Sequence, residues 1–115
     1  MATDLQNNEK LQRFIELLAT LNGQIVSILK TGDSELLLAM NDVIEEMHEI
    51  QSKGEEDAYT AIEEEMQMIC QNFNAVVAIV KSEDELDENS SIAVKNFLKN
   101  MFEATVRIVY AYGLA

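Results

Sequence analysis

The only histidine of the 115-residue chain, His48, follows Glu45 by three positions. Residues three apart share one face of a helix, so this Glu-x-x-His spacing could offer two ligands to one metal ion. A di-iron centre in a helical bundle needs a second such motif with its own histidine. Because the chain has no second histidine, we expect no di-iron site.

His48 could instead accept a phosphoryl group. In length, in expected helix number and in carrying an exposed histidine on its second helix, the chain resembles histidine phosphotransfer domains. The resemblance implies phosphotransfer through His48. Such domains usually carry a lysine and a small residue soon after the histidine, whereas Lys53 and Gly54 come two positions late here. Glu45 and Glu49 would also repel a phosphoryl group. An ordinary solvated histidine is the alternative.

Other residue types with catalytic or ligand chemistry form no recognisable site. Cys70 is the single cysteine, so no intrachain disulfide can form, and no basic residue near it in sequence would activate its thiol. The acidic run at residues 83–88 lacks the glycine turn and the alternating spacing of a calcium loop. Phosphate loops, serine–histidine signatures and zinc spacings are absent from the sequence. We therefore expect no cofactor and no enzymatic activity.

Helical periodicity organises most of the chain. Apolar residues recur at spacings of three and four in four segments, which predicts helices over residues 4–30, 34–53, 56–81 and 91–112. The third segment has the clearest stripe, with Phe73 at its centre. Gly32 is suited to end the first helix, and Ser90 or Ser91 to begin the last one. The polar residues 82–91 are interpreted as a loop.

These segments predict the architecture. The chain lacks proline, and 48% of its residues are hydrophobic, which favours one all-α domain over residues 1–115. Short loops between long helices favour an antiparallel, up-down-up-down four-helix bundle. The last helix is apolar on several sides, so we expect a homodimer that forms through it. The expected interface residues are Phe97, Phe102, Val106, Val109 and Tyr110.

The net charge of −13 is distributed unevenly. Residues 33–65 hold twelve acidic residues and one basic residue, Lys53, whereas residues 92–115 hold one acid and three bases. This charge disfavours direct binding to nucleic acids and to anionic membranes. It favours a basic protein partner, which a one-sided acidic surface would attract. The expected partner-binding residues are Glu45, Glu46, Glu49, Glu55, Glu56 and Asp57.

The leading functional hypothesis is a non-enzymatic protein-binding module, such as a small adaptor, chaperone or inhibitor. The chain is similar in size, charge and helix content to the small acidic chaperones of bacterial export systems. Three alternatives stay open: a nucleic-acid mimic that inhibits a DNA- or RNA-binding protein, phosphotransfer through His48, and a structural subunit of a larger assembly. The polar N-terminus and the absence of a long apolar run favour the cytoplasm.

Overall fold

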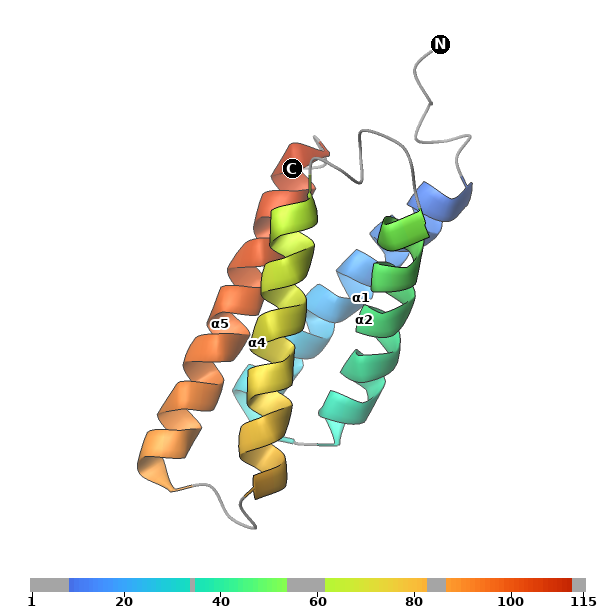
Figure 1. Ribbon diagram of the computed structural model, residues 1–115. Helices are drawn as coiled ribbons and strands as arrows, with labels where there is room; N and C mark the ends of the chain where they lie inside the picture. Colours follow the sequence, from blue (N-terminus) through green and yellow to red (C-terminus); the bar gives the residue numbers. More distant parts are fainter. Residues whose placement is uncertain (1–8, 34, 54–61, 83–86, 113–115) are drawn as a thin grey trace.

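The computed structural model of the protein describes residues 9–33, 35–53, 62–82 and 87–112. These residues form four antiparallel helices, and each helix buries one apolar stripe. The helices run up, down, up and down along the bundle (Figure 1). The predicted all-α, antiparallel four-helix bundle is confirmed. In chain order the helices are α1 (Glu9–Thr31), α2 (Leu36–Lys53), α4 (Glu63–Ser82) and α5 (Glu88–Ala111).

The bundle consists of two helical hairpins. The most extensive contacts join α1 to α2 and α4 to α5, while α1 meets α5 and α2 meets α4 over shorter stretches. The two hairpins therefore pack face to face, with α2 and α5 at opposite corners (Figure 1). The outer side of α2 and the outer side of α5 consequently face different directions.

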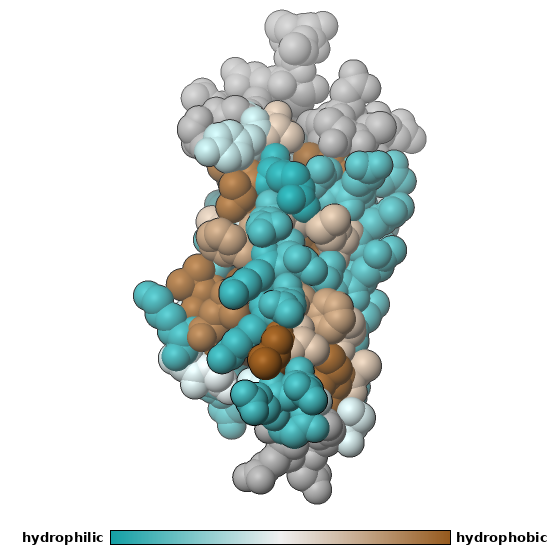
Figure 2. All heavy atoms as spheres, turned by 90° about the vertical axis from the view of Figure 1, so that its left-hand side faces the viewer, coloured by the Kyte–Doolittle hydropathy of each residue, from teal (hydrophilic) through white to brown (hydrophobic). Residues whose placement is uncertain are grey.

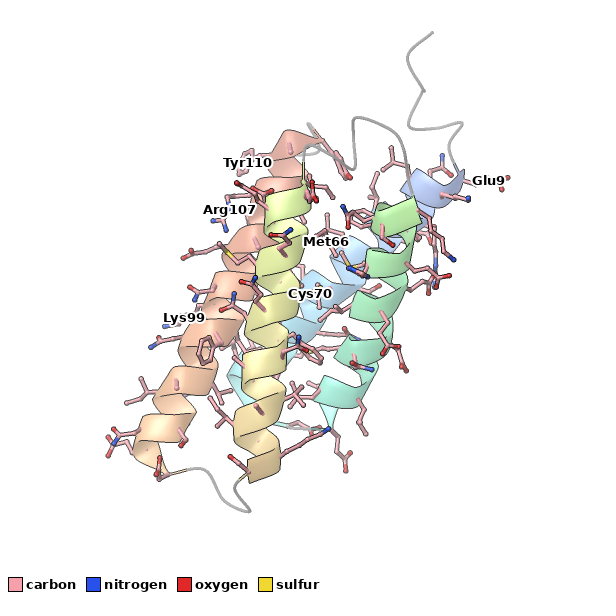
Figure 3. All side chains as sticks on the ribbon, in the orientation of Figure 1. Glu9, Met66, Cys70, Lys99, Arg107 and Tyr110 are labelled. Atoms are coloured by element: carbon pink, nitrogen blue, oxygen red, sulfur yellow. The ribbon has the colours of Figure 1, made fainter. Side chains whose placement is uncertain are left out.

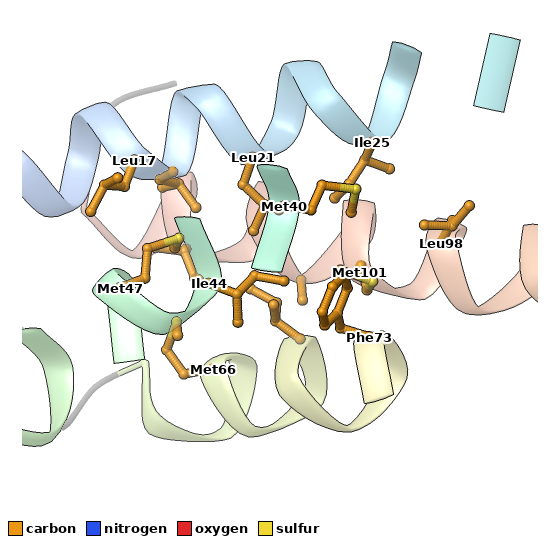
Figure 4. Packing of buried hydrophobic residues seen from close by; sticks show 14 of the residues in the cluster. Leu17, Leu21, Ile25, Met40, Ile44, Met47, Met66, Phe73, Leu98 and Met101 are labelled. Atoms are coloured by element: carbon orange, nitrogen blue, oxygen red, sulfur yellow. The ribbon is translucent and has the colours of Figure 1, made fainter. Parts of the chain in front are cut away.

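One hydrophobic core runs between all four helices. Phe14 of α1 and Phe73 of α4 are buried in it, at 0% and 3% exposure. Four methionines fill the space between the leucine and isoleucine side chains of facing helices (Figure 4). Methionine is unbranched and adapts to irregular gaps, which suits this position. These methionines are Met40, Met47, Met66 and Met101.

The turn between α1 and α2 is formed as its residue types predict. Gly32 ends α1 with a φ of 69°, a left-handed conformation that side chains disfavour, and its amide donates to the Ile28 carbonyl at 2.8 Å. Asp33 then accepts a hydrogen bond from the amide of Glu35 at 3.0 Å, just before α2 begins. The expected helix starts at residues 4 and 56 lie outside the described residues.

The start of α5 corrects the sequence-based prediction. The helix begins at Glu88, and its cap is Asp87 rather than Ser90 or Ser91. The Asp87 carboxylate accepts a hydrogen bond from the Ser90 amide at 2.7 Å. Because the helix N-terminus carries a partial positive charge, a carboxylate is at least as good a cap here as a hydroxyl. Part of the segment interpreted as a loop is therefore the first turn of α5.

A polar contact that the sequence did not predict joins the two hairpins. Thr105 is completely buried on α5, and its hydroxyl accepts a hydrogen bond from the Asn22 side chain of α1 at 3.0 Å. The same hydroxyl donates to the Phe102 carbonyl at 2.6 Å. Since a buried hydroxyl without partners would be costly, this pair fixes how α1 and α5 sit against each other.

Replacing Phe73 by alanine should lower the free energy of unfolding by about 3–5 kcal/mol, because it removes a buried aromatic side chain from the core. The exposed His48 on α2 is the control, and its replacement by alanine should cost less than about 0.5 kcal/mol. Urea unfolding of both variants measures the difference. The opposite ranking would contradict the helix phases described above.

Replacing Asp87 by alanine should destabilise the bundle near neutral pH. The hydrogen bond from Ser90 holds the pKa of Asp87 below its ordinary value. A lowered pKa in the folded state stabilises the fold above the unfolded-state pKa of about 3.9, and this stabilisation is lost as the pH falls through the folded pKa. The urea midpoints of the wild type and of Asp87→Ala should therefore converge on acidification. Asp87→Asn, which keeps an acceptor but no charge, should show a smaller loss at neutral pH. A gap that does not change with pH would contradict this account.

Candidate protein-binding surface

The outward side of α2 carries a line of four exposed side chains. Their spacings of four, three and four residues place them on one face of the helix. Leu38 stands at one end of this line with 76% of its surface exposed, the highest value among the exposed large hydrophobic residues described. We call these four residues the α2 ridge: Leu38, Asp42, Glu45 and Glu49.

The carboxylates of the α2 ridge differ in their partners. Glu49 accepts a hydrogen bond from the Lys53 ammonium at 2.7 Å, and this contact holds its pKa below the ordinary value. Glu45 accepts a weaker hydrogen bond from Asn41 at 3.3 Å. Within the described part of the chain, Asp42 and Glu45 take part in no ion pair. The middle of the ridge therefore keeps two negative charges that face solvent.

Glu46, one of the predicted partner-binding residues, is held by the neighbouring helix instead. Arg13 of α1 binds its two carboxylate oxygens with hydrogen bonds of 2.7 and 3.0 Å. The hydrogen bond from this guanidinium lowers the pKa of Glu46. A bidentate pair of this kind occupies the acceptor positions that a basic partner would use. Glu46 therefore contributes less free charge to the surface than its sequence position suggests.

The three other predicted partner-binding residues, Glu55, Glu56 and Asp57, lie outside the described residues. Of the six, the structure brings Glu45 and Glu49 together on the α2 ridge. The prediction that these acids bind a partner stays a prediction.

A groove between α2 and α4 borders the ridge. It has a volume of about 310 Å³, and Leu38 belongs to both the groove and the ridge. The walls are mainly apolar, and Asn41 and Lys81 are the polar residues of the lining. The groove lies where the two hairpins meet over a short stretch. The residues that line it are Leu37, Leu38, Asn41, Phe73, Val77, Val80 and Lys81.

Neither His48 nor Cys70 has the surroundings that its possible chemistry needs. His48 is exposed on α2, but Lys53, the lysine that could assist a phosphoryl group, is paired with Glu49. Cys70 is half-buried on α4, and burial raises the pKa of its thiol, which disfavours the thiolate that a nucleophile needs. Among the described residues, no three His, Cys, Asp or Glu side chains converge to hold a metal ion.

The predicted self-association residues of the last helix are mostly in contact with the bundle itself. Phe97, Phe102 and Val109 are partly buried and pack against the core, and Val106 is also partly buried. Tyr110 is 68% exposed and, like Lys99, projects from α5 away from the other helices (Figure 3). A homodimer through this helix stays a prediction. Of the five predicted interface residues, Tyr110 is the one whose side chain is largely exposed and could contact a second copy.

Comparison of the chain with protein-family models, with curated proteins and with solved structures gives no match. No helix in the described ranges combines the length and the apolar character needed to cross a membrane. The α2 ridge and its groove are therefore interpreted from their own geometry.

Sequence reasoning missed Leu38 and the α2–α4 groove. The signal that could have revealed Leu38 is the run Leu36-Leu37-Leu38, because consecutive residues on a helix point about 100° apart and cannot all face the core. In the structure Leu37 is buried, Leu36 is partly buried and Leu38 is exposed. Nothing local to α2 indicates that Val77 and Lys81, about forty residues further along the chain, complete the groove.

Replacing Arg13 by glutamine should raise the pKa of Glu46 towards its ordinary value, because the charged hydrogen-bond donors are removed. Side-chain carboxyl signals followed by NMR during a pH titration would report this change. The pKa of Asp87, which is held low by hydrogen bonds within α5, should stay the same and serves as an internal control. A Glu46 pKa that does not move would show that the Arg13 contact does not persist in solution.

Proposed function

We propose that this protein is a non-enzymatic binding module that recognises a basic partner protein through the α2 ridge. The observation that carries the proposal is the position of Leu38, which is 76% exposed in line with three exposed carboxylates. A large apolar side chain in such a setting offers a contact that a partner can desolvate, while the carboxylates attract lysine and arginine. The α2–α4 groove beside it could take an apolar side chain from the partner.

The partner segment that fits these features is an amphipathic one. Its apolar side chains would contact Leu38 and enter the groove, and its basic side chains would face Asp42, Glu45 and Glu49. An amphipathic helix laid into an apolar groove is a recurring mode of peptide recognition. The free thiol of Cys70 suits a reducing compartment, so we propose that this binding takes place in the cytoplasm.

The alternatives are less well supported. Phosphotransfer through His48 has no free lysine beside it, since Lys53 is paired with Glu49. A nucleic-acid mimic would use the same acidic surface and is the special case in which the partner itself binds DNA or RNA. Competition for the partner by duplex DNA would identify that case. A structural subunit of a larger assembly would bind its neighbours without the strong salt dependence expected of the ridge.

The ridge is tested by neutralising its charge without changing its shape. The wild-type protein should capture partner proteins from an extract of the cells that produce it. The triple variant Asp42→Asn, Glu45→Gln, Glu49→Gln should not capture these proteins. With a purified partner, the association rate at low salt should fall about tenfold or more, because electrostatic attraction acts mainly on association. Leu38→Ala should instead speed dissociation.

A matched control removes three exposed carboxylates elsewhere, with the substitutions Glu9→Gln, Glu88→Gln and Glu103→Gln on α1 and α5. It has the same net charge as the ridge variant and should bind nearly as the wild type does. Equal losses in the two triple variants would mean that overall charge acts rather than the ridge. Full binding by the ridge variant at low salt would refute the proposal.

A further inference from the structure

A second cavity lies at the end of the bundle where α1 ends and α5 begins. Its volume is about 320 Å³, at the lower end of the range typical of small-molecule sites. All four helices contribute to its lining, so the cavity sits at one end of the core rather than on one helix surface. Its apolar walls come from Ile28, Leu29, Leu37, Val80, Val94 and Leu98.

Two lysines stand at this cavity. Lys30 near the end of α1 and Lys95 in the second turn of α5 both line it, and both are exposed. In the described part of the chain neither takes part in an ion pair. The whole chain has 8 basic residues against 21 acidic ones, whereas the two charged residues in the lining of this cavity are both lysines. Ser91, one turn before Lys95, adds a hydroxyl to the lining.

We infer that this opening binds an alkyl carboxylate, a carboxylic acid with an unbranched chain of medium length. The apolar walls would take the chain, and Lys30 and Lys95 would hold the carboxylate at the solvent-exposed edge. A small inorganic anion would leave the walls uncovered, and a neutral hydrocarbon would not use the lysines. The site has both features, so it fits a ligand that is apolar at one end and anionic at the other.

Apolar side chains also reach the surface beside α5. In the view onto α5, hydrophobic surface, drawn in brown, lies on either side of the polar strip along that helix (Figure 2). Such surface next to an opening favours entry of an apolar chain from solvent. The carboxylates of the α2 ridge do not line this cavity, and the inference does not rest on the proposed protein partner, although Leu37 and Val80 line both the cavity and the α2–α4 groove.

The test uses decanoate at concentrations where it stays monomeric, with the full chain and NMR detection. We expect saturable one-site shifts at Val94, Leu98 and Ile28. Each methylene added between hexanoate and decanoate should strengthen binding about fourfold, as expected for a buried chain. Decanol, which has the same chain length without the charge, should bind about tenfold more weakly.

Two sets of variants separate the site from general binding to an apolar surface. Lys30→Gln with Lys95→Gln should weaken decanoate binding about tenfold and leave decanol binding unchanged. Lys99→Gln with Lys10→Gln is the matched control, because neither lysine lines the cavity, and it should bind decanoate as the wild type does. Ser91→Met narrows the opening at a partly exposed helix position and should weaken both ligands, with folding checked by circular dichroism.

Three results would overturn the inference. The first is non-saturable shifts spread over the whole bundle, which indicate detergent-like binding. The second is equal affinity for decanol and decanoate. The third is an equal loss of decanoate affinity in the two double-lysine variants, which would mean that the effect follows net charge and not the cavity.

Discussion

Burial of one apolar stripe from each helix determines the rest of this structure, because it fixes the rotation of each helix about its own axis. With Met40 and Met47 fully buried between facing helices, the opposite side of α2 must point to solvent. That rotation brings Leu38 and the three ridge carboxylates onto one outward face. The surface proposed to bind a partner is thus a direct consequence of the core, although none of its charged residues belongs to the core.

The same packing also redistributes charge. Repulsion within the acidic stretch of the sequence is relieved by basic residues from distant parts of the chain. Arg13 reaches Glu46 across the α1–α2 contact, and Arg107 lies 3.9 Å from Glu65 across the α4–α5 contact. Both pairs are within hairpins, where the helices are most closely packed. Among the described acids of this stretch, Asp42 and Glu45 in the middle of the α2 ridge stay without an ion pair, as do Glu35, Glu63 and Glu64.

The sequence was sufficient for the features that depend on local periodicity. The four helices, the burial of Phe73, the exposure of His48 and the glycine that ends α1 all follow from residue type and spacing. The sequence was not sufficient where several residues could cap the same helix. At the start of α5 the cap is Asp87, whereas the sequence had indicated Ser90 or Ser91. It also could not reveal contacts between residues far apart in the chain, such as Asn22 with Thr105, because periodicity carries no information about which helix faces which.

Both cavities discussed above lie where one hairpin meets the other, and this has a physical cause. Helices joined by a short turn are forced to pack along their length, whereas the two hairpins touch over shorter stretches. Side chains there fill the space less completely, and the polar contact of Asn22 with Thr105 takes the place of apolar packing at one point of this boundary. A ligand or partner segment that fills the remaining space would bury apolar surface of both hairpins at once. Binding at either cavity should therefore tighten the association of the hairpins, which couples occupancy of these sites to the stability of the whole bundle.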